Sequence, residues 1–229
     1  MIQHIAFIMD GNRRWAKKQG LQAFLGHKKG AEVLENVIDF CLKSKILYVS
    51  LYTFSLENFN RSTAEVRYLF DLLVNEASKK LDLFLNHGVR VRFVGDRTLF
   101  PASVIATVTM LEEKTASCTS LNLNFLFCYG ARQEIIGGIK KFYEDIKVGA
   151  VLLEDLNDES FKHYLWTGDM PEPELIIRTS GIKRLSNFLL YQAAYSEFYF
   201  LDCLWPEITQ DHMHEAVQSY FETKRNFGQ

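Results

Sequence analysis

The chain has 229 residues and a formal net charge of −2, so it can bury a sizeable core and lacks the positive charge of a general nucleic-acid binder. Its four cysteines form no Cys-x-x-Cys pair, which favours reduced thiols over a metal or redox motif. No apolar run reaches the roughly 20 residues of a membrane span, and the N-terminus does not resemble a signal peptide. We therefore expect a globular protein of the cytoplasm that does not bind nucleic acid.

Short apolar runs, rich in β-branched and aromatic residues, alternate with helical patterns along the chain. Several of these runs are apolar throughout, which is typical of strands covered on both faces. The predicted strands are Ile5–Met9, Tyr48–Phe54, Val89–Val94, Leu121–Phe127, Leu175–Arg178 and Phe198–Leu201.

Helical spacing is found between the predicted strands. Ser62 and Glu65 fit a capping box at the start of one long apolar stripe. The predicted helices are Lys28–Lys43, Ser62–Asn86, one that opens at Pro101, Arg132–Lys147, Asn187–Tyr195 and Thr209–Arg225. This alternation predicts right-handed βαβ units and a single α/β domain over residues 1–229, with a mostly parallel six-stranded sheet flanked by helices. Ligands of such sheets bind beyond the carboxyl ends of the strands.

The segment after the first strand combines one acid with several cationic groups. It reads Asp10, Gly11, Asn12, Arg13, Arg14 and Trp15. Gly11 permits a tight turn, the helix that follows favours an anion at its start, and arginine offers planar donors to phosphate oxygens. A single carboxylate among these cationic groups could bind Mg²⁺. An ordinary strand-to-helix turn with a solvated basic face explains this segment equally well when it is taken alone.

A polar loop follows the second predicted strand. It reads Ser55, Leu56, Glu57, Asn58, Phe59, Asn60 and Arg61. A plain polar turn is one interpretation. The loop holds the same position on its strand as Asp10 does on the first strand, which favours a binding site.

Three further features carry groups that can bind anions or metals. Gly26-His27 precedes a helix, and His27 can donate to a diphosphate oxygen, although such a histidine is more often structural. The loop after the fifth strand contains Arg178, Thr179, Gly181, Arg184, Leu185 and Ser186, in which Ser186 can cap the next helix. Glu197 adjoins the last strand, where an isolated carboxylate is usually a surface acid.

In their order and spacing, these segments resemble the signature regions of the cis-prenyltransferases, most closely the undecaprenyl diphosphate synthases. The resemblance extends from His4 to Phe227. It implies an enzyme that adds isopentenyl diphosphate units to an allylic diphosphate such as farnesyl diphosphate, with Mg²⁺ as cofactor. It also implies an apolar tunnel between the sheet and the helices, lined by Ala31, Leu34, Leu69, Leu73 and Leu121.

The resemblance further implies a role for each motif residue. Asp10 is the expected metal ligand and catalytic acid residue, with Glu197 as a second contributor to the metal site. Asn58 matches the position usually assigned as proton acceptor, although a neutral amide is a poor base. The residues expected to bind substrate are Gly11, Asn12, Arg13, Arg14, Trp15, His27, Ser55, Leu56, Glu57, Phe59, Arg61, Arg178, Arg184, Leu185 and Ser186.

The resemblance also implies that the protein is a homodimer. Its expected product is a lipid-carrier precursor for the bacterial cell wall, and we expect a peripheral membrane contact when that product is released. The chain departs from the family pattern at Ala23 and Asn226, where relatives often have arginine. Two alternatives remain. A phosphohydrolase is disfavoured because Asn12 stands where that chemistry needs a second acid. A non-catalytic subunit of a heteromeric prenyltransferase is disfavoured because Asp10 is retained.

Overall fold

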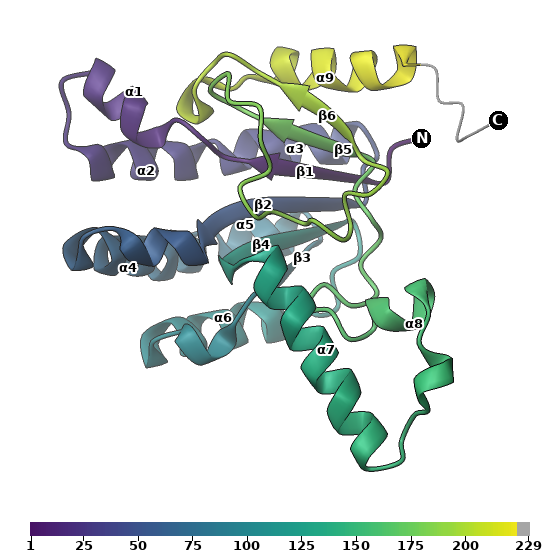
Figure 1. Ribbon diagram of the computed structural model, residues 1–229. Coiled ribbons are helices and arrows are strands. Elements are labelled where there is room, and N and C mark those ends of the chain that lie inside the picture. Colours follow the sequence, from purple (N-terminus) through teal and green to yellow (C-terminus); the bar gives the residue numbers. More distant parts are fainter. Residues whose placement is uncertain (224–229) are drawn as a thin grey trace.

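Six parallel strands form one twisted sheet at the centre of the protein, as the alternating pattern predicts (Figure 1). The computed structural model describes residues 1–223. The strands are β1 (His4–Ile8), β2 (Tyr48–Ser55), β3 (Val89–Val94), β4 (Leu121–Tyr129), β5 (Leu175–Arg178) and β6 (Glu197–Phe200). Every pairing between neighbouring strands is parallel, so all six carboxyl ends meet at one edge of the sheet.

The order of the strands places a reversal of chain direction between β1 and β5. Across the sheet the order is β3-β4-β2-β1-β5-β6. The chain leaves β1 towards β2 on one side, and it leaves β5 towards β6 on the other side. Such a reversal opens a crevice at the carboxyl ends of the two strands, which is where open α/β sheets bind ligands.

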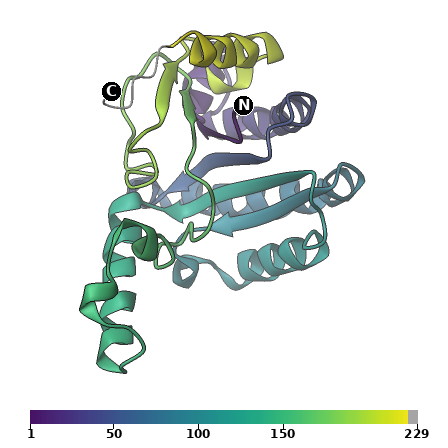
Figure 2. The ribbon, with the colours of Figure 1, turned by 90° about the vertical axis from the view of Figure 1, so that its right-hand side faces the viewer.

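Both faces of the sheet are covered, which explains why β1 is apolar throughout. Ile5 and Phe7 belong to one buried cluster, whereas Ala6 and Ile8 belong to a second cluster on the other face. Figure 2 shows α7 extending well beyond the sheet. The α-helices in the described part are α1 (Asn12–Lys18), α2 (Ala23–Glu32), α3 (Leu34–Lys43), α4 (Thr63–Lys79), α5 (Leu81–Asn86), α6 (Ala102–Lys114), α7 (Ala131–Lys147), α8 (Asp158–Lys162) and α9 (Gln210–Glu222).

The helix predicted at Asn187–Tyr195 is wrong, and Ser186 therefore caps no helix. This stretch is a series of turns. Ser186, Asn187 and Leu189 have φ angles of 52°, 64° and 42°, which are incompatible with a right-handed helix. Phe188 and Leu189 are nonetheless fully buried, because the turns direct both side chains into the core beneath them.

Two helices predicted as continuous are each divided. The first begins at Ala23 rather than Lys28 and is interrupted at Val33, whose φ and ψ of −65° and −22° remain helical. The second is divided at Lys80 into α4 and α5. Ser62 accepts a hydrogen bond from the backbone N–H of Glu65, which confirms the predicted cap.

The last helix is described only as far as residue 223. The end of the helix predicted at Thr209–Arg225, and the tail with Asn226, lie outside the described residues. Within residues 1–223, no helix is long and apolar enough to span a membrane.

Two glycines let α2 lie directly against the loop that follows β1. A Cβ added to Gly26 would lie 1.9 Å from the backbone oxygen of Asn12, and one added to Gly30 would lie 2.2 Å from Asn12 Oδ1. No side chain fits at either position. The Gly26-His27 motif therefore has a packing function, since it brings His27 next to the residues that follow Asp10.

We predict that Gly26→Ala lowers the free energy of unfolding by about 1–3 kcal/mol, because the added methyl group displaces backbone in a packed contact. Urea denaturation measures the loss. Gly137→Ala in α7 is the matched control, because its Cβ would meet its nearest neighbour, Trp166, at an ordinary 3.7 Å. There, better helix propensity should leave stability unchanged or raise it by up to about 1 kcal/mol. Equal effects of the two substitutions would contradict the packing argument.

Candidate active site

An ion pair joins the two strands that flank the crevice. Asp10 follows β1 and Arg178 ends β5, and Arg178 Nη2 donates to Asp10 Oδ2 at 2.9 Å. The side chain of Arg178 is only 5% exposed, whereas that of Asp10 is 30% exposed. Thr179 fixes the loop, because its hydroxyl accepts from the Asp10 N–H and donates to the Asp10 carbonyl. The structure thus brings together two of the predicted site residues, which lie 168 positions apart in the sequence.

The carboxyl group of Asp10 is held in its charged form. Partial burial is the largest influence and acts to raise its pKa, but the hydrogen bond and charge of Arg178, a hydrogen bond from Ser180 and the charge of Arg14 together lower it below the usual value. Arg14 Nη2 lies 3.2 Å from Asp10 Oδ1. Both carboxylate oxygens therefore face a guanidinium group.

Arg178 also organises the loop that follows β5. Its Nη1 donates to the carbonyl of Arg184 and, at 3.0 Å, to the hydroxyl of Ser186. The Tyr52 hydroxyl is 3.2 Å from the Ser186 carbonyl. The backbone of this loop is thus anchored, while the side chain of Arg184 is exposed.

A second carboxylate, Glu65, gathers three groups on the other side of the crevice. Arg61 Nη1 donates to its Oε1 at 3.0 Å, and Arg13 Nε and His27 Nε2 lie 3.8 and 3.9 Å from the same oxygen. Glu65 was expected only as part of a helix cap. Arg61 precedes the N-cap Ser62, so helical spacing gave no signal for this ion pair.

His27 is neutral in this setting. Burial, followed by the charge of Arg61, lowers its pKa to about 4, and the nearby Glu65 only partly opposes this shift. Its Nε2 is buried and has no hydrogen-bond partner. A neutral imidazole can donate from that nitrogen to an anion without contributing a charge.

Some of the predicted anion-binding residues line one polar pocket, whereas Arg178, Arg184 and Ser186 do not. Its lining consists of Met9, Asp10, Gly11, Asn12, Arg13, Arg14, His27 and Arg61. The predicted residue Trp15 does not line this pocket, because it lies further along α1. Three arginines against one acid make this pocket a site for an anion.

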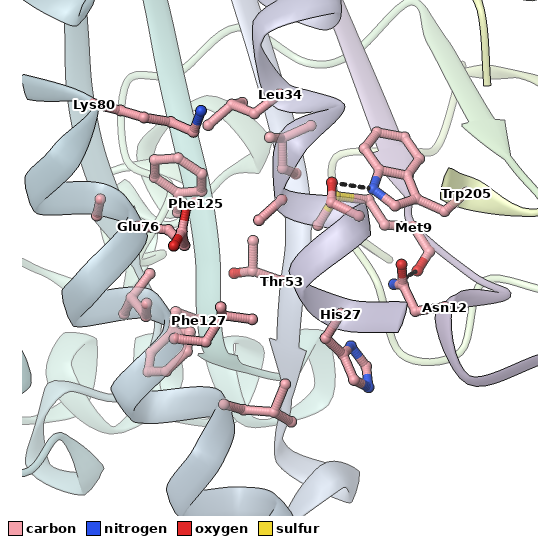
Figure 3. A pocket seen from close by; sticks show the side chains of 17 residues that line it. Met9, Asn12, His27, Leu34, Thr53, Glu76, Lys80, Phe125, Phe127 and Trp205 are labelled. Atoms are coloured by element: carbon pink, nitrogen blue, oxygen red, sulfur yellow. Dashed lines mark hydrogen bonds between the residues drawn. The ribbon is translucent and has the colours of Figure 1, made fainter. Parts of the chain in front are cut away.

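A second, apolar pocket opens from the first and runs between the sheet and α2, α3 and α4 (Figure 3). It holds about 790 Å³ of space, including its open end. Met9, Asn12 and His27 line both pockets and so connect them. The apolar pocket is lined mainly by aliphatic and aromatic side chains, which include Ala31, Leu34, Leu51, Leu69, Leu72, Leu73, Phe125, Phe127 and Trp205.

This pocket is the apolar tunnel expected between the sheet and the helices, with one correction. Leu121 does not line it. Leu121 and Leu123 are fully buried in the core, since the pocket reaches along β4 only from Phe127 to Phe125. Trp205, which the sequence analysis missed, closes one wall and donates from Nε1 to the carbonyl of Gly30 at 2.9 Å. That contact joins residues 175 positions apart, so local sequence gave no signal for it.

Two buried polar atoms without a partner belong to residues that line both pockets, Asn12 and His27, and a third belongs to Arg178, which pairs with Asp10. Among the described residues, four buried side-chain atoms lack a hydrogen-bond partner, and three of them are Asn12 Oδ1, His27 Nε2 and Arg178 Nε. Such atoms are costly unless a ligand or water satisfies them. The atoms of Asn12 and His27 are therefore available to a ligand at this junction.

The loop after β2 is arranged mainly by its own contacts. The Ser55 N–H donates to Asn58 Oδ1 at 3.2 Å, so the side-chain oxygen of Asn58 already caps the short helical turn Leu56–Asn60. Glu57 accepts from Asn187 Nδ2 at 2.8 Å, which ties this loop to the loop after β5. Leu56 packs against the core.

Two other predicted binding residues of the loops also serve in packing. Phe59 contacts Phe54 edge-to-face at 5.0 Å while remaining 39% exposed. Leu185 packs against the buried cluster on the opposite face of the sheet.

Glu197 is not near Asp10 within the chain. It is the first residue of β6 and pairs with Leu175, which pairs in turn with Ile5. Asp10 lies five residues further along, about 16 Å in the strand direction. Within one chain the two acids therefore lie at opposite ends of the parallel strands, and the contribution of Glu197 to a metal site stays a prediction.

The side chains at this site allow a metal ion whose remaining ligands come from the substrate. Within residues 1–223, no group of three or more His, Cys, Asp or Glu side chains could hold a metal ion. Asp10 alone offers a partly exposed carboxylate. Mg²⁺ commonly binds one or two carboxylates and takes its other ligands from substrate phosphates and water, so Asp10 fits that mode.

Comparison with known proteins agrees with these pockets. Residues 8–228 match the family model described as "Putative undecaprenyl diphosphate synthase". The chain is 43% identical to an isoprenyl transferase of Thermotoga maritima over 226 residues, which cover 99% of this chain and 96% of that protein. The chain belongs to the undecaprenyl diphosphate synthase family of cis-prenyltransferases. It is therefore a prenyltransferase, and the family implies diphosphate substrates.

Other members of this cis-prenyltransferase family differ in what they bind. A tritrans,polycis-undecaprenyl-diphosphate synthase of Thermoplasma acidophilum, named as specific for geranylgeranyl diphosphate, is 40% identical over 99% of this chain and 88% of its own. The crystal structure of lavandulyl diphosphate synthase from Lavandula x intermedia with dimethylallyl diphosphate has a TM-score of 0.96 and 27% identity, covering 100% and 98% of the chains. A probable undecaprenyl diphosphate synthase from Campylobacter jejuni has a TM-score of 0.83 and 32% identity, covering 100% and 99%.

We predict that His27 makes the protein less stable in acid. Its pKa is 6.5 in the unfolded chain and about 4 in the folded one. Between these values the unfolded chain binds a proton that the folded chain does not, so the free energy of unfolding falls as the pH falls from 6.5 to 4. The loss should be about 1–3 kcal/mol.

Chemical denaturation at a series of pH values measures this slope. His27→Gln should reduce it, whereas His163→Gln, which changes a histidine whose side chain is 67% exposed, should not. His4 is buried with a pKa of about 4 as well, so part of the slope remains in the variant. An unaltered slope in His27→Gln would refute the prediction.

Proposed function

We propose that this chain catalyses the Mg²⁺-dependent, sequential cis-condensation of isopentenyl diphosphate onto an allylic diphosphate, with farnesyl diphosphate as the starter. The observation that carries the proposal is the connection between a cationic pocket and an apolar pocket through Met9, Asn12 and His27. An allylic diphosphate has the same two parts, a highly charged head and a long apolar tail. A substrate with only one of these parts would leave one pocket unused.

The reaction requires stabilisation of a leaving diphosphate. The bond between allylic carbon 1 and oxygen breaks, and its electron pair leaves with the diphosphate. The double bond of isopentenyl diphosphate forms the new carbon–carbon bond to that carbon. A proton is then lost, which creates the new cis double bond. Cationic donors that face the diphosphate lower the barrier because they stabilise charge that develops on it.

We assign the first diphosphate to the pocket after β1. Arg13, Arg14 and Arg61 supply charge, the N–H groups at the start of α1 supply dipoles, and His27 supplies a neutral donor. Asp10 would hold Mg²⁺ together with diphosphate oxygens. When bound there, the ion neutralises charge on the leaving group.

We assign isopentenyl diphosphate to the loop after β5. Arg178 and Ser186 lie against each other, the Arg178 Nε has no partner, and the exposed Arg184 can turn towards an anion. The ion pair between Arg178 and Asp10 brings this second site next to the first, as bond formation between two substrates requires.

Asn58 is better suited to positioning than to proton transfer. Its Oδ1 already accepts the Ser55 N–H, and an amide is a poor base. We propose that Asn58 shapes the loop that carries Arg61, and that a diphosphate oxygen takes the proton.

In the cell we propose a cytoplasmic homodimer that makes the lipid-carrier precursor for bacterial cell-wall synthesis and touches the membrane during product release. Geranylgeranyl diphosphate, in the name of the Thermoplasma acidophilum relative, is the alternative starter. Incubation with Mg²⁺, labelled isopentenyl diphosphate and each starter, followed by measurement of product lengths, tests both. Absence of any elongated product would favour a non-catalytic subunit instead.

We expect Asp10→Asn to abolish Mg²⁺-dependent condensation. The amide still accepts a hydrogen bond from Arg178, so the buried guanidinium keeps a partner and the variant folds, whereas the charge that binds the ion is lost. Radiolabelled product formation and circular dichroism measure the two effects. Asp169→Asn, which alters an acid with an 85% exposed side chain, should retain activity. Near-normal turnover by folded Asp10→Asn would exclude the proposed metal role.

We expect Arg184→Ala to raise the KM for isopentenyl diphosphate by about ten- to a hundredfold, since one charge-assisted phosphate contact contributes about 1.5–3 kcal/mol. The KM for the allylic substrate should change much less. Steady-state kinetics with each substrate varied in turn separates the two values. Lys183→Ala, at the exposed neighbouring position, is the matched control. The assignment fails if the two variants have the same KM for isopentenyl diphosphate.

A further inference from the structure

The apolar pocket has two charged residues at the end remote from His27. Glu76 and Lys80 of the α4 region line it there, together with Phe125 (Figure 3). They lie four residues apart and so share one side of the helix. The other polar groups of the lining lie nearer the diphosphate site, apart from Thr53, whose hydroxyl donates to the Leu126 carbonyl at 2.8 Å.

Lys80 is a buried cation with one acidic partner. Its side chain is 11% exposed, and its Nζ donates to Glu35 Oε1 at 2.6 Å. Glu35 lies in the first turn of α3 and its side chain is 55% exposed. The pair therefore links the junction of α4 and α5 to α3, across the end of the space between these helices.

An apolar chain that grows to this point meets a charge. Going further would require it either to displace the pair or to remove water from Glu35, and both are unfavourable because neither charge gains a new partner from a hydrocarbon. Beyond Phe125, the next residues on that face of β4, Leu123 and Leu121, are already packed in the core. No apolar continuation of the pocket exists on that side.

We propose that the Lys80–Glu35 ion pair forms the end wall of the pocket and limits the length of the prenyl chain that it accepts. This inference rests on the proposed function, because it takes the pocket to hold the growing chain. It assigns the limit to the charge on Lys80 rather than to the volume of its side chain.

Removal of that charge at nearly constant volume tests the proposal. Lys80→Met and Lys80→Leu both introduce a residue with high helix propensity. Glu35 stays exposed to water when its partner is lost, because its side chain is 55% exposed. Product lengths are measured for the wild type and for both variants, and thermal unfolding shows which of them fold. Lys43→Met is the matched control, since it breaks the 2.7 Å ion pair with Asp39 on the outer side of α3.

We expect the Lys80 variants to shift the most abundant product to longer chains by at least one isoprene unit, while Lys43→Met resembles the wild type. An unchanged or shorter product distribution in a folded Lys80 variant overturns the proposal. If the wild type makes no product at all, the proposed function fails, and the end wall is then judged by binding alone.

The binding measurement uses n-alkyl phosphates of increasing length and isothermal titration calorimetry. Affinity for the wild type should rise about fourfold per methylene group until the chain reaches Lys80, and then level off. In Lys80→Met the rise should continue to longer chains. The same limiting length in wild type and variant overturns the proposal, whether or not the protein catalyses condensation.

Discussion

The contact between Asp10 and Arg178 is the constraint on which the rest of the site depends. It joins residues 168 positions apart, at the ends of the two strands between which the chain reverses its direction across the sheet. Without the carboxylate, Arg178 would be a nearly inaccessible cation with no acidic partner, a situation that typically costs about 3–5 kcal/mol. The protein therefore obtains its central crevice and its two adjacent anion sites from one interaction.

The cationic side chains around this contact outnumber the acids that hold them in place, so the site keeps a positive charge. Arg14 and Arg178 share Asp10, while Arg13 and Arg61 share Glu65 with His27. Each carboxylate holds several donors close together in the absence of a ligand, so the site is organised before substrate arrives. The excess of cations supplies the attraction for a diphosphate. His27 contributes a donor without adding to the repulsion among the arginines, because it is neutral.

The sheet, and the edge of it at which Asp10 and Arg178 lie, could be predicted from sequence, because parallel strands bring their carboxyl ends to one edge; that β1 and β5 are neighbours could not. The turns at Asn187–Tyr195 could not. Their apolar spacing fits a helix, and only the positive φ angles of residues such as Leu189 exclude one. Glu65 and Lys80 acquire their roles from helices that meet in three dimensions. Glu197 was expected at the metal by resemblance alone, and the strand register separates it from Asp10 within one chain.

The position of Trp205 has a consequence for synthesis on the ribosome. It completes a wall of the apolar pocket whose other parts come from residues 9 to 127, and it does so by bonding to Gly30. The central strand β1 likewise cannot pair along its second edge until β5 has been synthesised. A nascent chain that ends before β5 therefore exposes a half-built apolar cavity and an unpaired edge of β1, both of which promote aggregation. The N-terminal half cannot mature alone, and protection by a chaperone matters most just before residue 205 emerges.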